Sequence, residues 1–129
     1  MAEFQIGATR EDVVEIGNDQ TIKFLGAEAR VLSTPQMILF MERTCRNLIL
    51  GVVEPGSDSV GTHVNVSHCD VAPVGSKVTF SAELISVNNR RADFRVRAVL
   101  GERVIGEGTH QRAVIEISRF AEKVKTVTT

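Results

Sequence analysis

The sequence has 129 residues, of which 43% are hydrophobic and 24% are charged, as in an ordinary globular domain and unlike a disordered chain. Lys and Arg number 15 and Asp and Glu number 16, so the net charge is −1. This balance argues against a protein that binds nucleic acid by neutralising phosphates and against a polybasic membrane anchor. No apolar run approaches the ~20 residues of a membrane-spanning helix. We expect a single domain over residues 1–129, with no nucleic-acid or membrane partner.

The start of the sequence and its two cysteines bear on the cellular compartment. The first residues, MAEFQIGATREDVVEIG, lack the basic start and apolar stretch of a signal peptide. Cys45 and Cys69 fit neither a disulfide framework nor a zinc pattern. We therefore expect a cytoplasmic protein whose two thiols are reduced and buried.

Residues 12–16 and 21–25 are rich in β-branched and aromatic side chains, and a polar GNDQ stretch separates them. Such a pattern predicts two short strands joined by a turn.

A helix is predicted over residues 35–51. Thr34 occupies the position of an N-cap, Pro35 the first helical position and Gly51 the end. The apolar side chains recur at helical spacing and extend around most of the circumference, so the helix should be covered on most sides. They are Ile38, Leu39, Phe40, Met41, Cys45, Leu48, Ile49, Leu50 and Val52.

The rest of the chain alternates apolar and polar residues in the way of half-buried strands. We predict strands over 60–68, 77–87, 92–100 and 104–117, with a hairpin turn at Asn88-Asn89 and a tight turn at 101–103. Gly106 and Gly108 inside the last strand indicate a bulge or a close backbone approach. A meander of one-sided strands after one apolar helix predicts an α+β hot-dog fold, an antiparallel sheet wrapped around a central helix.

Three polar residues are candidates for chemistry. Glu42 lies on the apolar side of the helix, His68 falls on the inward face of its strand, and Thr34 precedes the helix. Each has an ordinary structural explanation: a paired edge carboxylate, a hydrogen-bonded core histidine and an N-cap. Thr34 and Glu42 are eight residues apart, about 12 Å along a helix, and a histidine from the sheet would complete a hydroxyl, carboxylate and imidazole set.

Other common chemistries lack their motifs. The glycines form neither GxGxxG nor a P-loop, and no GxSxG elbow is present. His63, His68 and His110 have no metal-ligand spacing, so we expect no metal and no redox cofactor.

Three blocks, STPQMILFMERTC, VGTHVNVSHCDVAPVGSKVTFSAEL and GEGTHQRAVI, resemble the fluoroacetyl-CoA thioesterase family of the hot-dog superfamily in order and spacing. The resemblance covers about residues 31–125. It implies a catalytic set of Thr34, Glu42 and His68, with Gly61 and Arg112 beside the substrate.

One stretch departs from that family. The member specialised for fluoroacetate carries phenylalanines upstream of its threonine that gate the acyl pocket, whereas the matching positions here are Leu25 and Glu28. The resemblance thus implies thioester hydrolysis, while these two residues argue against fluoroacetyl selectivity.

We interpret the protein as a homodimeric acyl-CoA thioesterase for a small or medium acyl group. Glu42 would serve as general base or as nucleophile, with His68 and Thr34 orienting and stabilising charge and the Gly61 N–H as oxyanion donor. We expect His68 within a few ångströms of Glu42 or of a shared water. Two alternatives stay open: a hot-dog hydratase or dehydratase acting on an acyl thioester, and a non-catalytic acyl-CoA-binding protein.

Overall fold

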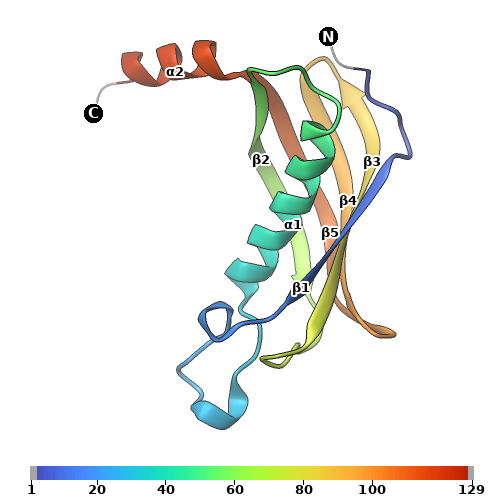
Figure 1. Cartoon of the computed structure of the whole chain (residues 1–129), viewed down its shortest axis with the longest axis vertical. Coiled ribbons are helices and arrows are strands. Elements are labelled where there is room, and N and C mark those ends of the chain that lie inside the picture. Colours follow the sequence, from blue (N-terminus) through green and yellow to red (C-terminus); the bar gives the residue numbers. More distant parts are fainter. Residues whose placement is uncertain (1–2, 128–129) are drawn as a thin grey trace.

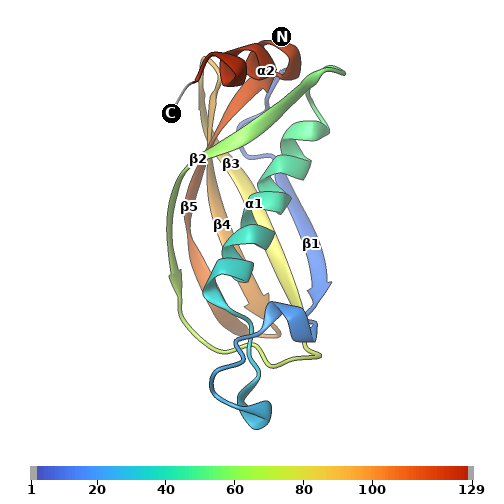
Figure 2. The same ribbon diagram turned by 90° about the vertical axis from the view of Figure 1, so that its left-hand side faces the viewer.

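A computed structural model describes residues 3–127 of the chain. Its centre is a five-stranded antiparallel sheet in the order β1-β3-β4-β5-β2, which curves around the long helix α1 (Figures 1 and 2). The hot-dog fold predicted from the sequence is thereby confirmed. The elements are β1 (Thr9–Glu15), α1 (Thr34–Leu50), β2 (Ser57–His68), β3 (Lys77–Asn88), β4 (Arg91–Leu100), β5 (Arg103–Glu116) and α2 (Ile117–Thr126).

Helix α1 begins one residue earlier than predicted. The side chain of Ser33 accepts a hydrogen bond from the backbone N–H of Gln36 at 3.3 Å, which makes Ser33 the N-cap. Thr34 is therefore the first helical residue, and its predicted capping role is wrong. Its hydroxyl is left available for another partner, while Pro35 occupies the first turn and Gly51 closes the helix as predicted.

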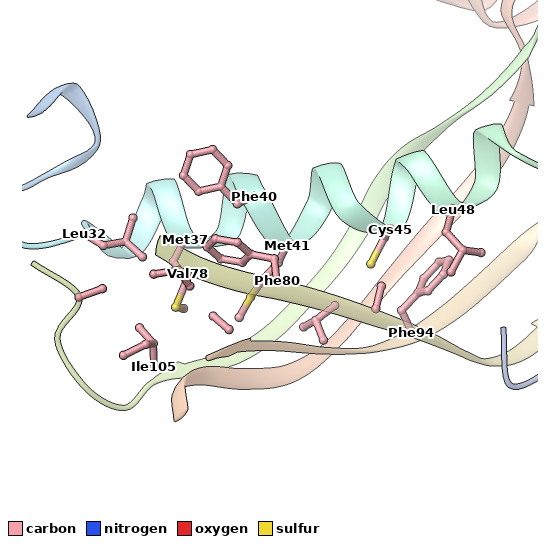
Figure 3. Close-up of a cluster of buried hydrophobic side chains, with 14 of the residues drawn as sticks. Leu32, Met37, Phe40, Met41, Cys45, Leu48, Val78, Phe80, Phe94 and Ile105 are labelled. Carbon is pink, nitrogen blue, oxygen red and sulfur yellow. The ribbon is translucent and has the colours of Figure 1, made fainter. Parts of the chain in front are cut away.

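The hydrophobic core lies between α1 and the concave face of the sheet (Figure 3). Phe40 of α1 packs against Phe80 of β3 with ring centroids 5.2 Å apart. Strands β3 and β4 bury alternate residues, as their period-two pattern predicts. The strand residues buried on this face are Val78, Phe80, Ala82, Leu84, Ala92, Phe94, Val96 and Ala98.

The segment between β1 and α1 differs from the prediction. Residues 21–25 form no strand: Thr21 makes a single bridge to Leu32, between two short 3₁₀ turns at Asn18–Gln20 and Ala27–Ala29. The side chains of Phe24 and Leu25 are 82% and 59% exposed, so this β-leaning segment finds no face to bury against. The segment projects from the N-terminal end of α1 (Figure 1).

The C-terminal helix α2 was not predicted, because residues 104–117 were assigned to one strand that ran to the end of the apolar pattern. In the structure β5 ends at Glu116, and α2 projects away from the sheet with no buried residue (Figure 1). None of the helices in residues 3–127 is both long and apolar enough to span a membrane.

Close backbone approaches explain the glycines of β5. A Cβ at Gly108 would collide with the carbonyl oxygen of Asn65, and one at Gly106 with the side chain of Met37. The predicted close approach is therefore confirmed. On the neighbouring strand β2, the register shifts between Gly61 and His63, so the alternation predicted over 60–68 is broken there.

The two cysteines are both free, and they differ in burial. Cys45 lies in the core, where burial raises the pKa of its thiol to about 12. Cys69 is exposed, contrary to the prediction, because it follows the last residue of β2 and lies outside the face that the helix covers.

Candidate active site

The first residue of α1 and the last residue of β2 meet at one end of the helix. The Thr34 hydroxyl lies 2.7 Å from Nδ1 of His68. Partial burial lowers the pKa of His68, while the backbone of Asp70 opposes that shift. His68 is therefore neutral at pH 7. When Nε2 carries the ring proton, Nδ1 accepts a hydrogen bond from the Thr34 hydroxyl.

Glu42 lies two turns further along α1 and faces the β2–β5 edge of the sheet. Its Oε2 atom is 3.5 Å from Nη1 of Arg112 and 3.9 Å from Nε2 of His110. The Glu42 side chain is 36% exposed, so its carboxylate is reachable from solvent while its charge is compensated. The carboxylate on the apolar side of the helix is thus explained by a cation from the sheet.

Gly61 of β2 makes room for this carboxylate. A Cβ at this position would come within 2.5 Å of Oε2 of Glu42 and 3.1 Å of Cε1 of His110. Any larger residue would displace the carboxylate, so the glycine is required by the close approach of Glu42.

Arg112 is held rigidly on the inner face of β5, where its side chain is 6% exposed. Its Nε donates to the hydroxyl of Ser59 at 2.8 Å, and its Nη2 donates to the backbone carbonyl of Ser59 at 2.9 Å. Burial lowers the pKa of Arg112, and the Glu42 carboxylate counters that effect. The guanidinium nevertheless stays charged at neutral pH.

The structure therefore arranges the five predicted residues as two groups. Thr34 and His68 form one, and Glu42, Gly61 and Arg112 form the other. Within residues 3–127, no hydrogen bond or ion pair joins His68 to Glu42, so the expected direct contact between them is not seen. The two groups lie about 12 Å apart along α1 at 1.5 Å per residue.

Each group opens onto its own surface hollow. One hollow, lined by Leu39, Arg43 and Arg46, contains Glu42 and Arg112. The other contains Thr34 and His68 and is completed by residues 69–71. Arginines around the first hollow make it suitable for an anionic substrate.

Sequence reasoning missed two members of the site, Ser59 and His110. Both are buried, at 5% and 1% exposure, and both contact Arg112. The signal that could have found His110 is its spacing of two from Arg112 in a strand, which places both side chains on one face. The described residues contain no cluster of three His, Cys, Asp or Glu side chains that would bind a metal.

The fold and the paired polar groups place the chain among the hot-dog proteins. The model of the fluoroacetyl-CoA-specific thioesterase family matches residues 16–118, and the chain belongs to this family. The fluoroacetyl-CoA thioesterase of Streptantibioticus cattleyicolor is 43% identical over 98 residues, which are 76% of this chain and 70% of that protein.

Solved structures agree with this assignment. The fluoroacetyl-CoA thioesterase FlK superposes with a TM-score of 0.89 at 34% identity, covering 98% of this chain and 99% of FlK. A variant of FlK in complex with fluoroacetate and CoA matches with a TM-score of 0.83 at 35% identity, covering 91% and 99%. A thioesterase superfamily member from Thermus thermophilus has the same fold, with a TM-score of 0.88 at 23% identity over 97% of this chain and 93% of that one.

Substitutions at Ser33 and Thr34 distinguish the helix cap from the hydroxyl that is hydrogen-bonded to His68. Ser33→Ala should lower the free energy of unfolding by about 1 kcal/mol, because it removes the N-cap. Thr34→Val leaves the cap intact and removes only a hydrogen bond at an exposed position, so it should cost less than Ser33→Ala. Urea unfolding followed by circular dichroism measures both. A larger loss in Thr34→Val would mean that Thr34 has the capping role after all.

Proposed function

We propose that the protein hydrolyses the thioester of a small or medium acyl-CoA to the free acid and CoA. Membership of the fluoroacetyl-CoA-specific thioesterase family makes it a thioester hydrolase. The observation that carries the proposal is a solvent-accessible carboxylate, Glu42, held by buried Arg112 and seated against the backbone of Gly61.

In the general-base route, Glu42 takes a proton from a water molecule as the water oxygen attacks the thioester carbonyl carbon. The tetrahedral oxyanion that forms is stabilised by a backbone N–H. Gly61 is the candidate donor, because it has no side chain and so lets the substrate approach its backbone closely. The C–S bond then breaks, CoA leaves as the thiolate and takes up a proton, and the acid is released.

In the nucleophilic route, an oxygen of Glu42 attacks the carbonyl carbon directly and CoA leaves as the thiolate. The product of this step is a mixed anhydride between Glu42 and the acyl group. Water then hydrolyses the anhydride and restores the carboxylate. Both routes use the carboxylate of Glu42, which lies beside the guanidinium of Arg112.

Thr34 and His68 support the same reaction from the N-terminal end of α1. A neutral imidazole hydrogen-bonded to a hydroxyl can take up the hydroxyl proton at Nδ1 while it releases the proton on Nε2, so that the ring stays neutral. We assign this pair to orienting the substrate and stabilising the charges that develop on it. Arg112 contributes to substrate binding through the field that it sets up beside Glu42.

The acyl specificity differs from that of the fluoroacetate enzyme. Leu25 and Glu28, which stand where that enzyme has its gating phenylalanines, are exposed on the segment before α1. Neither side chain offers the aromatic surface that a phenylalanine gate provides. We therefore propose a thioesterase without fluoroacetyl selectivity.

The outer edge of β2 supports a homodimer. Within residues 3–127, β2 is an edge strand that pairs with β5 alone, and residues 61–65 along it are exposed, with Val64 at 40%. An open edge beside the Glu42 hollow favours pairing with a second copy, which would continue the sheet and enclose the substrate. The two free thiols suit a cytoplasmic location.

The dimer is tested by multi-angle light scattering at micromolar concentration. We expect a mass twice that of the chain, because pairing satisfies the exposed backbone groups of β2. A clean monomer would contradict the proposed assembly.

Replacing Glu42 tests the chemistry. Glu42→Gln keeps the size of the side chain and removes its charge, so hydrolysis should fall by about 10²-fold or more, the scale of a lost general base. Stability should hardly change, because the neutral amide still reaches Arg112. Release of CoA thiol is followed across short, branched, aryl and long acyl-CoAs, and this readout also separates hydrolysis from enoyl hydration.

The matched control is Glu102→Gln, which makes the same change at an exposed turn between β4 and β5 and should leave the rate unaltered. Turnover of Glu42→Gln that stays within threefold of the parent across these substrates would exclude Glu42 as base or nucleophile.

A further inference from the structure

His110 is a buried histidine that the reaction described above does not use. It lies on the inner face of β5, where it is 1% exposed. Its Nδ1 is 2.8 Å from the backbone carbonyl oxygen of His63. Because a carbonyl oxygen only accepts hydrogen bonds, Nδ1 must carry a proton.

The other ring nitrogen faces a donor. Nε2 of His110 is 3.1 Å from Nη1 of Arg112, and a guanidinium group only donates. Nε2 must therefore be unprotonated and accept this hydrogen bond. The two partners together select one state of the ring, the neutral tautomer with its proton on Nδ1.

The electrostatic surroundings favour the same neutral state. Burial lowers the pKa of His110, and the positive charge of Arg112 on β5 and the ring of His63 on β2 lower it further. The Glu42 carboxylate on α1 and the carbonyl of His63 act in the opposite direction. Burial is the largest effect, so the ring is neutral at pH 7.

Arg112 is thus held by hydrogen bonds on two sides. Ser59 accepts hydrogen bonds from Nε and Nη2, which fixes one edge of the guanidinium. Nη1 is left with two hydrogens, of which one points to His110 and the other to Glu42 at 3.5 Å. The hydrogen bond to His110 therefore determines the direction in which Nη1 presents its second hydrogen to the carboxylate.

We propose that His110 is a positioning residue that uses its unprotonated Nε2 to aim Arg112 at Glu42. The inference rests on the proposed function only in that Glu42 is the reacting group. His110 also ties this network to the bulge in β2, because His63 is the residue at which the register resumes after Gly61. The imidazole of His110 consequently links the β2 backbone beside Glu42 to the guanidinium of Arg112 that contacts Glu42.

Two variants of His110 separate its two hydrogen bonds. The amide of Asn reaches the position of Nδ1 and that of Gln the position of Nε2. His110→Asn should thus keep a donor to His63 and lose the acceptor for Arg112, whereas His110→Gln should do the reverse. Each removes one buried hydrogen bond, so their melting temperatures should be lowered by similar amounts.

The proposal predicts different effects on turnover. His110→Asn should lower kcat by about tenfold or more, because small displacements of reacting groups have effects of this size. His110→Gln should keep kcat within about threefold of the parent, since it still orients Arg112. Equal losses of kcat in the two variants, or no loss in His110→Asn, would overturn the proposal.

The unaltered protein offers a test that does not depend on how the variants fold. Two-dimensional ¹⁵N NMR of histidine-labelled protein reports which ring nitrogen is protonated, with His110 assigned by comparison with His63→Gln and His68→Gln. We expect the neutral Nδ1–H tautomer at pH 7 to 8. The Nε2–H tautomer or a charged ring would overturn the proposal. If the protein released no CoA from any acyl-CoA while this tautomer was observed, the proposed function would fail and the placement of His110 would stand.

Discussion

A carboxylate on the apolar side of a covered helix requires a cation, and the arrangement of this site follows from that requirement. Arg112 reaches Glu42 from β5, the strand that lies beside the edge strand β2. For the two charges to meet, the backbone at Gly61 must approach without a side chain, and the guanidinium must be fixed by other acceptors. Removing the cation from such a partly buried pair is costly because it leaves the carboxylate uncompensated.

The candidate site contains one charged pair, Glu42 with Arg112, and one neutral pair, Thr34 with His68. Arg112 lies beside Glu42 without covering it, so the carboxylate is accessible for its proposed role as base or nucleophile. Thr34 and His68 lie two helical turns away and form a separate neutral pair. The proposed reacting group and the proposed orienting pair line two separate hollows along α1, an arrangement that suits an extended substrate such as an acyl-CoA.

The sequence predicts the parts of the fold that rest on periodicity. Strands β3 and β4 are buried on the faces that their patterns indicate. Helix α1 is covered on fewer sides than predicted, because Leu39 and Leu50 are exposed. The prediction fails at 21–25, where β-leaning residues have no neighbouring strand, and at α2, which has no buried residue. These outcomes depend on tertiary contacts, which a local pattern does not contain.

The sequence nominates residues for the candidate site but does not predict how they contact one another. Glu42 is recognisable in the sequence because its charge interrupts an apolar stripe. Nothing in the local sequence distinguishes Ser59 and His110, which come together only through the pairing of β2 with β5. Ser33 and Thr34 are adjacent and chemically similar, so only the geometry of the first turn distinguishes the cap from the partner of His68. Hydrogen bonds between distant segments follow from register, which a bulge in β2 shifts by one residue.

The most direct test of the coupling between Arg112 and Glu42 is a double-mutant cycle on kcat/KM for thioester hydrolysis. If Arg112 acts by holding the Glu42 carboxylate in place, Arg112→Met should lower kcat/KM by about tenfold or more in the parent and by less than about threefold in the Glu42→Gln background, as expected for residues in contact. An equal loss in both backgrounds would show that the two residues act independently and would contradict the account.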